Sequence, residues 1–168
     1  LSFFELDPLV VALAQRRFTY LARTPAATRI AVGDGRLLLA RAARQDFDVL
    51  VLDAFASDAV PVHLLTLEAF TAYRRHLAPD GVLLANVSNR HLAVDRVVRA
   101  AARRLGLACA VIETDADAAR FVSKVRWAVL ARDPAQLARE IEGQKTLAAS
   151  GSEVLWTDAR ASVWSIRK

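Results

Sequence analysis

The chain has 168 residues, of which 54% are hydrophobic, so it is long enough for one domain with a full core and too short to predict two. Its 23 Lys and Arg exceed its 18 Asp and Glu by five, but the arginines come mostly as pairs on predicted helices. Solvated helix faces explain this pattern. Because no basic stripe is interleaved with aromatic residues, the sequence predicts no nucleic-acid partner.

The residue types that hold disulfides and metals are sparse. Cys109 is the single cysteine, and it is typical of a small buried hydrophobe. The three histidines have neither HxxxH spacing nor a cysteine cluster, so no metal site is predicted. No run of about 18 apolar residues occurs, which predicts no membrane contact by this segment. Without a signal peptide, a cytoplasmic location is expected.

Predicted strands and helices alternate along the chain. The first segment, Leu1 to Leu6, is a strand, and Pro8 begins a helix behind Asp7 as its N-cap. Further strands are predicted at 28–32, 49–52, 82–87, 108–114 and 126–131, and helices at 9–23, 36–44, 67–77, 92–105 and 134–148. This order predicts an α/β fold with a doubly wound, mostly parallel sheet and a C-terminal antiparallel strand pair.

One domain is expected over residues 1–168, with a C-terminal tail at 150–168. The chain opens inside an apolar strand and lacks an initiator Met, so we expect a piece of something longer.

An apolar strand followed by two acids forms the centre of the predicted site. Residues 49–52 are uninterrupted and half of them are β-branched, which suits a strand covered on both faces. Asp53 follows at the carboxyl end, where ligands bind in open α/β sheets. Asp58 lies in the same loop. The alternative is that Asp53 merely caps a turn.

Three successive strands each deliver a carboxylate to the same predicted edge: Glu5, Asp34 and Asp53. Glu5 is placed to accept two hydrogen bonds from a ribose diol. Asp34 lies in a Gly-Asp-Gly turn that allows close backbone approach, and it can accept from an exocyclic amine such as that of adenine. Asp53 and Asp58 can together hold a cationic amine and take its proton, which is general-base chemistry.

The order FELDP, VGDG, FDVLVLDAF, a Pro-containing loop with LLT, and a strand after PDG resembles the spermidine synthase family of aminopropyltransferases. That family shares the S-adenosylmethionine methyltransferase fold, and the resemblance covers roughly residues 1–114. Trp156-Thr157-Asp158 is similar to the polyamine-synthase-like proteins, some of which are fused to membrane transporter segments. In that context Asp158 is a candidate to face the substrate pocket.

The resemblance implies a role for each matching residue. Glu5 would bind the ribose hydroxyls of decarboxylated S-adenosylmethionine or of the methylthioadenosine product. Asp34, with Gly35, would contact the adenine. Asp53 matches the acid that deprotonates the attacking amine of putrescine, and Asp58 matches a second acid that grips the diamine.

The same resemblance implies an amine and a nucleoside as small-molecule partners, and no metal is expected from the residue pattern. It leaves open a homodimer, and a cytoplasmic domain of a membrane-fused parent.

The chain departs from the family pattern in two places. Four residues separate Asp53 from Asp58 where the family has two, and the glycine-rich first strand that precedes FELDP is not in the sequence. We therefore expect a sheet whose first strand is missing.

Two alternatives to aminopropyl transfer remain open. One is a methyltransferase that uses intact S-adenosylmethionine, with Asp53 and Asn86 only shaping the pocket. The other is a catalytically degenerate nucleotide-binding domain of a larger protein. The two acids favour aminopropyl transfer, because they would repel the methionine carboxylate of the intact cosubstrate and prefer a decarboxylated, cationic one.

Overall fold

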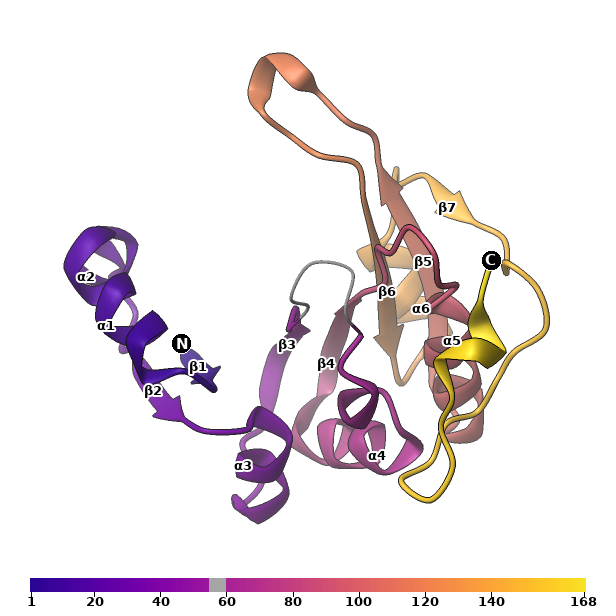
Figure 1. Cartoon of the computed structure of the whole chain (residues 1–168), viewed down its shortest axis with the longest axis horizontal. Helices are drawn as coiled ribbons and strands as arrows, with labels where there is room; N and C mark the ends of the chain where they lie inside the picture. The colour runs from indigo at the N-terminus through magenta and orange to yellow at the C-terminus, as the bar shows by residue number, and fades with distance from the viewer. Residues whose placement is uncertain (55–59) are drawn as a thin grey trace. The chain divides into compact units, whose positions relative to one another are not determined.

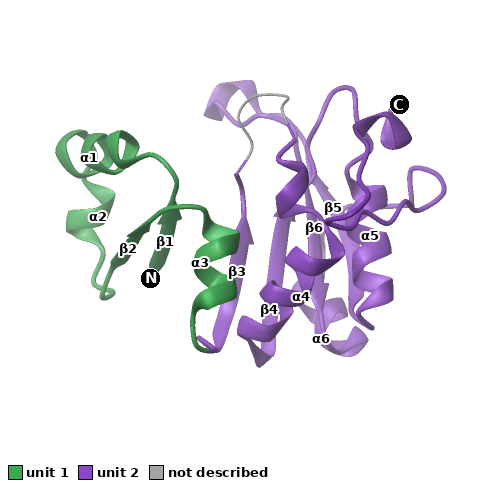
Figure 2. Cartoon of the chain, turned by 60° about the horizontal axis from the view of Figure 1, so that its bottom comes forward, with its two compact units in different colours: residues 1–43 green, residues 44–168 purple. Residues whose placement is uncertain are grey.

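The computed structural model describes residues 1–54 and 60–168, which divide into two compact units, Leu1–Ala43 and Arg44–Lys168 (Figure 2). Strands and helices alternate through most of the chain (Figure 1), as the sequence predicts for the α/β class. Each unit holds its own hydrogen-bonded sheet. The single domain expected over 1–168 stays a prediction.

The first unit is a two-stranded parallel sheet with three short helices. Strand β1 (Ser2–Glu5) pairs in parallel with β2 (Arg29–Val32). The helices are α1 (Pro8–Arg17), α2 (Tyr20–Arg23) and α3 (Gly35–Arg41).

The start of α1 confirms a local prediction. The Asp7 carboxylate accepts a hydrogen bond from the Leu9 amide at 2.8 Å, and Pro8 is the first helical residue. The single helix predicted over 9–23 is wrong, because Phe18 adopts an extended backbone that separates α1 from α2.

The second unit contains a five-stranded sheet in the order β3-β4-β6-β5-β7. Its strands are β3 (Phe47–Leu52), β4 (Leu77–Asn86), β5 (Ala108–Thr114), β6 (Val125–Ala131) and β7 (Thr146–Leu147). The β3–β4 ladder is parallel, and β6 runs antiparallel to both β4 and β5. Strands β5 and β6 are therefore the predicted C-terminal antiparallel pair.

Helices cover both faces of this second sheet. They are α4 (Leu67–His76), α5 (Asp95–Arg104) and α6 (Pro134–Glu140), with 3-10 turns η1 (Val62–Leu64), η2 (Ala118–Arg120) and η3 (Val163–Ile166). Leu83 and Leu130 are paired and fully buried, whereas Val82 and Val129 face the other side with Leu137 of α6. No helix in the described residues is both long enough and apolar enough to cross a bilayer.

Three predictions for this unit are wrong in detail. The helix expected over 134–148 ends at Glu140, because the chain turns at Gly143 with a φ of 74° and then pairs as β7 with β5. The strand expected at 82–87 begins earlier, because residues 77–81 already belong to β4, where Gly81 passes close to the Phe47 carbonyl and leaves no room for a Cβ. Strand β3 is not covered on both faces, since Val49 and Val51 are each 53% exposed.

Candidate active site

The carboxyl ends of β1 and β2 bring two of the predicted residues close together in the first unit. Glu5 is the last residue of β1 and stands opposite Val32 in the ladder. The backbone amide of Gly33 donates to the Glu5 carbonyl at 2.8 Å, and the next residue, Asp34, caps α3. The parallel register therefore places Glu5 and Asp34 at one end of this sheet, as predicted.

Both carboxylates already make local hydrogen bonds. Glu5 Oε1 accepts from the Asp7 amide at 3.0 Å, and Asp34 Oδ1 accepts from the Leu37 amide at 2.9 Å. Gly33 has a φ of 141°, which only glycine adopts readily, and a Cβ on Gly35 would lie 3.2 Å from Phe4 Cβ. The glycines thus give a close-packed turn, and the carboxylates of Glu5 and Asp34 each accept a hydrogen bond from a nearby backbone amide.

In the second unit, Asp53 is held by a side chain from the neighbouring strand. Asp53 follows β3, and Asn86 ends β4, which lies beside β3 in parallel. The Asn86 Nδ2 donates to Asp53 Oδ1 at 2.9 Å, while Asn86 Oδ1 accepts from the Ser88 amide at 2.8 Å. Because the Asn86 amide is held at both ends, it fixes the direction of an otherwise exposed carboxylate.

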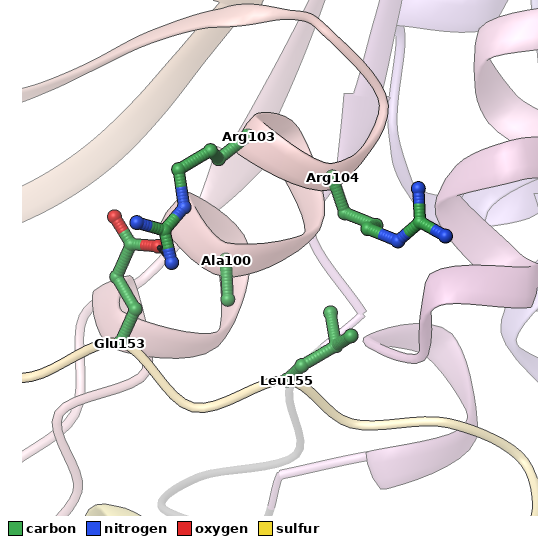
Figure 3. A pocket seen from close by; sticks show the side chains of 5 residues that line it. All are labelled: Ala100, Arg103, Arg104, Glu153 and Leu155. Carbon is green, nitrogen blue, oxygen red and sulfur yellow. Dashed lines mark ion pairs between the residues drawn. The ribbon is translucent and has the colours of Figure 1, made fainter.

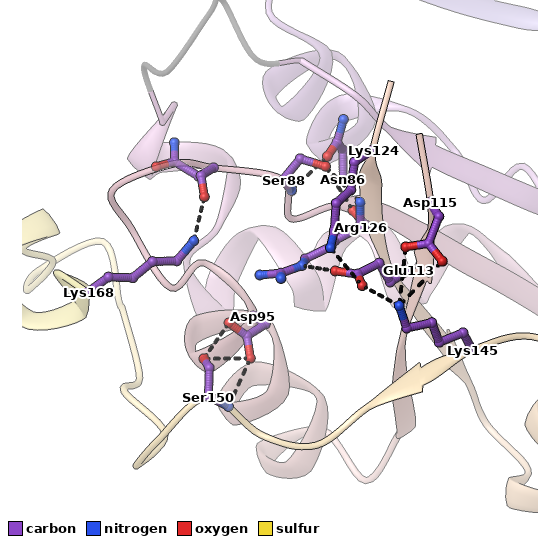
Figure 4. Close-up of polar contacts among 11 residues, drawn as sticks. Asn86, Ser88, Asp95, Glu113, Asp115, Lys124, Arg126, Lys145, Ser150 and Lys168 are labelled. Atoms are coloured by element: carbon purple, nitrogen blue, oxygen red, sulfur yellow. Dashed lines mark hydrogen bonds and ion pairs between the residues drawn. The ribbon is translucent and has the colours of Figure 1, made fainter. Parts of the chain in front are cut away.

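The tip of β4 is in turn tied to β6. Ser88 Oγ accepts from the backbone amide of Arg126 at 2.8 Å, and the Val87 amide donates to the Arg126 carbonyl at 2.9 Å. The contact extends the β4–β6 ladder beyond its last paired residues (Figure 4). Asn86, which contacts Asp53, is therefore held in place by the hydrogen bonds between the end of β4 and β6.

Arg126 also takes part in an ion cluster around Glu113, which lies on β5. The Glu113 carboxylate, 3% exposed, contacts Arg126 Nε at 2.8 Å, Lys145 Nζ at 2.9 Å and Lys124 Nζ at 3.0 Å (Figure 4). These hydrogen bonds, Arg126 first, lower the pKa of Glu113 from 4.5 to about 2. Sequence reasoning missed this cluster, because only the β5–β6 register pairs Glu113 with Arg126.

The remaining predicted residues are less directly placed. Asp58 lies outside the described residues. Asp158 Oδ1 accepts from Thr66 Oγ1 at 2.7 Å, and the Asp158 amide donates to Glu68 Oε2 at 3.0 Å. Asp158 therefore lies at the amino end of α4, at the end of the connection that begins with Asp53.

A pocket of about 310 Å³ lies elsewhere in the second unit, between the last turns of α5 and residues 153–155 (Figure 3). Its lining includes Arg103 and Glu153, whose side chains are paired at 2.8 Å. Since α5 begins after the carboxyl end of β4 and ends before β5, its last turn is at the opposite edge of the sheet from Asp53. None of the predicted site residues within 1–54 and 60–168 lines this pocket.

Neither a reactive thiol nor a metal site is found among the described residues. Cys109 is largely buried, and burial raises the pKa of its thiol to about 11. Across residues 1–54 and 60–168, no three His, Cys, Asp or Glu side chains gather in a way that could hold a metal ion.

Known proteins similar to this chain share its sequence over about half its length. It is 37% identical over 84 residues to a polyamine aminopropyltransferase of Vibrio vulnificus, which is 49% of this chain and 27% of that protein. It is 34% identical, again over 84 residues, to a probable polyamine aminopropyl transferase of Bifidobacterium longum, of which the match covers 18%. No protein-family model matches the chain.

Solved structures share the fold over nearly the whole chain. A probable spermidine synthase from Corynebacterium glutamicum has a TM-score of 0.63 at 19% identity, with 96% of this chain and 64% of that one covered. A spermidine synthase bound to the transition-state analogue AdoDATO has a TM-score of 0.61 at 14% identity, over 94% and 53%. Human methyltransferase-like protein 13 with SAH has a TM-score of 0.56 at 16% identity, over 82% and 66%.

The fold is therefore the α/β fold that spermidine synthases and S-adenosylmethionine methyltransferases share. Over the half that aligns in sequence, the chain is similar to polyamine aminopropyltransferases. The predicted resemblance to the spermidine synthase family is thus confirmed, and the match spans about a quarter or less of each curated relative.

Proposed function

We propose that the protein transfers an aminopropyl group from decarboxylated S-adenosylmethionine to putrescine or a related amine. The observation that carries this proposal is the Asp53–Asn86 pair, a carboxylate directed by an amide at the ends of two adjacent parallel strands. Its position follows the rule for ligand sites in open α/β sheets. The sequence likeness to polyamine aminopropyltransferases supports the same assignment.

Asp53 is the general base of this proposal. A neutral amine attacks the propyl carbon that is bonded to the sulfonium sulfur, a C–N bond forms, and the C–S bond breaks with its electrons going to sulfur. The proton released by the amine passes to the Asp53 carboxylate, and methylthioadenosine leaves. Asn86 keeps one carboxylate oxygen occupied, so the other is left to accept the proton.

Glu5, Asp34 and Gly35 form the proposed nucleoside site. Glu5 Oε1 is held by the Asp7 amide, which leaves Oε2 available for a ribose hydroxyl. Asp34 is the N-cap of α3 in a Gly-Asp-Gly turn, and the glycines of this turn would allow a planar base to approach the backbone. The solved relatives bound to AdoDATO and SAH support a nucleoside ligand of this class.

Asp58 and Asp158 are the acids that the sequence assigns to amine binding, and both assignments are part of the proposal. Carboxylates near Asp53 favour a cationic diamine and disfavour the carboxylate of an intact methionine tail. By the same family resemblance we place the reaction in the cytoplasm.

Methyl transfer is the second candidate, and the likeness of the fold to the SAH-bound human methyltransferase favours it. In that reaction Asp53 and Asn86 would shape the pocket and would not take a proton from an amine. A third reading, a degenerate nucleotide-binding domain, predicts that neither transfer occurs.

The test is a transfer assay on this chain and on the complete gene product if that is longer. Each is incubated with putrescine and either decarboxylated or intact S-adenosylmethionine, and the products are identified by mass spectrometry. Spermidine and methylthioadenosine support the proposal. A methylated amine and S-adenosylhomocysteine would instead support methyl transfer. No product from either cosubstrate would support the third hypothesis, a degenerate nucleotide-binding domain.

A further inference from the structure

Residues 156–168, named here the C-terminal strap, contact the chain segments that follow β3 and β4. The strap begins at Trp156, which is 1% exposed, and the Trp156 carbonyl accepts from the Leu67 amide at 2.8 Å. Leu67 is the first residue of α4. The strap thus starts at the end of the connection that leads from Asp53 into α4.

A three-residue clasp fixes this point. Thr66, 2% exposed, is the N-cap of α4, and its Oγ1 accepts from the Ala69 amide at 3.3 Å. The same hydroxyl donates to Asp158 Oδ1 at 2.7 Å, and the Asp158 amide donates to Glu68 Oε2 at 3.0 Å. Both hydrogen bonds involve a carboxylate, which makes them stronger than neutral ones.

The far end of the strap holds the segment after β4. The Ile166 carbonyl accepts from the Ala93 amide at 2.8 Å, and the Lys168 amide donates to the His91 carbonyl at 2.9 Å. Lys168 Nζ also donates to the Asn89 carbonyl at 2.6 Å (Figure 4). Residues 89–93 follow soon after Asn86 and Ser88, so the strap contacts a segment that follows each member of the Asp53–Asn86 pair in the chain.

We propose that Asp158 is a positioning residue, which acts through Thr66 to set the start of α4 for binding of the amine. This inference rests on the proposed function and gives Asp158 a role different from direct contact with substrate. Ile166 is fully buried and anchors the strap at its other end. Because the strap is held at both ends, the clasp can determine where the start of α4 lies relative to the sheet that precedes Asp53.

The contacts of the preceding residues provide a matched control. Residues 150–153 are fastened to α5 instead, with Ser150 Oγ donating to Asp95 Oδ1 at 2.7 Å and Arg103 paired with Glu153 at 2.8 Å. Ser150→Ala removes one such contact without touching the start of α4. Asp133→Ala removes the N-cap of α6, so it measures the cost of losing a helix cap away from the clasp.

The experiment compares Thr66→Val and Asp158→Ala with Thr66→Ser, which keeps the hydroxyl, and with the two controls. Steady-state kinetics are measured separately for the amine and for decarboxylated S-adenosylmethionine, together with hydrogen exchange at residues 67–70. We expect both clasp variants to raise the amine KM about tenfold, as the loss of a charge-assisted hydrogen bond implies. Their cosubstrate KM stays within about twofold, and exchange at 67–70 accelerates. Thr66→Ser and both controls keep the wild-type amine KM.

Three results would overturn the inference. An amine KM raised by Asp158→Ala but not by Thr66→Val would mean that Asp158 touches the substrate directly. Equal effects of Asp133→Ala and Thr66→Val on the amine KM would mean that only stability was lost. Unchanged hydrogen exchange at residues 67–70 in Asp158→Ala would show that the clasp does not hold the start of α4. That last readout needs no turnover, so it judges the clasp even if the wild-type protein transfers nothing and the proposed function fails.

Discussion

The carboxylates of the two units are held in different ways. In the first unit, Glu5 and Asp34 accept hydrogen bonds from backbone amides two and three residues further along the chain. In the second unit, Asp53 accepts from Asn86, a side chain 33 residues away on the next strand. A local turn or helix cap therefore accounts for Glu5 and Asp34 without any ligand, whereas the contact of Asp53 within the described residues comes from a neighbouring strand.

This contrast separates the predicted residues whose positions are explained by local stability from those whose positions point to a function. An acid that caps a helix stabilises it whether or not a ligand binds. An exposed acid that is directed by an amide from another strand gains little stability from that contact, since exposed polar contacts contribute little. We therefore expect substitutions of Asp53 and Asn86 to affect activity more than substitutions of the other predicted residues.

Asp53→Asn should give the largest effect. Removing the base should lower aminopropyl transfer by at least about a hundredfold, while binding of methylthioadenosine stays at the wild-type level. The matched control is Asp48→Asn, the same change at another exposed acid on the strand that precedes Asp53, and it should leave transfer intact. Turnover near that of the wild type in Asp53→Asn would remove Asp53 from the role of base.

Asn86→Ala should have a smaller effect on the same step. Without the amide, the Asp53 carboxylate loses its fixed direction, and we expect kcat to fall about tenfold with little change in nucleoside affinity. The pre-steady-state rate of transfer is the measurement. An unchanged rate would show that the Asn86 contact is incidental, and an equal loss of nucleoside affinity would show that it supports the fold instead.

Glu5→Gln should affect binding and not chemistry. Losing charged hydrogen bonds to the ribose should weaken binding of methylthioadenosine by about 1 to 3 kcal/mol. Titration calorimetry measures this, with Asp7→Asn as the control because asparagine still caps α1. If the affinity of Glu5→Gln equals that of wild type, Glu5 serves only its local turn.

Glu113→Gln should change the pH dependence of stability. The pKa of Glu113 is about 2 in the folded protein and near 4.5 when its partners are lost, so the unfolded state binds more protons between these values. Its contribution to stability is present above about pH 4.5 and is lost as pH falls toward 2. Urea unfolding from pH 5 to 2 should show a shallower decline for Glu113→Gln, and identical declines would contradict the cluster.

Much of the fold follows from local patterns in the sequence. Asp7 with Pro8 marks the start of α1, and Gly106, with a φ of 66°, ends the segment after α5, because caps and glycine turns depend on neighbouring residues only. The order of strands and helices and the acids at the strand ends are predicted in the same way. The family resemblance adds the roles of those acids.

What the sequence could not predict depends on register and on distant contacts. The Asp53–Asn86 bond requires that β3 and β4 be neighbours, and the Glu113–Arg126 pair requires the β5–β6 register. The grouping of the strands into two hydrogen-bonded sheets is likewise set by pairing rather than by local propensity. Asp158 shows the same limit, since its partner Thr66 is 92 residues away.

The measurement that tests aminopropyl transfer most directly is calorimetric titration of this chain, and of the complete gene product if it is longer, with three ligands. These are decarboxylated S-adenosylmethionine, methylthioadenosine and S-adenosylhomocysteine. A cationic or uncharged tail suits a site that contains Asp53, whereas the amino-acid carboxylate of S-adenosylhomocysteine would meet repulsion there. We predict that the first two ligands bind more tightly than the third. Tighter binding of S-adenosylhomocysteine would contradict the account and favour methyl transfer.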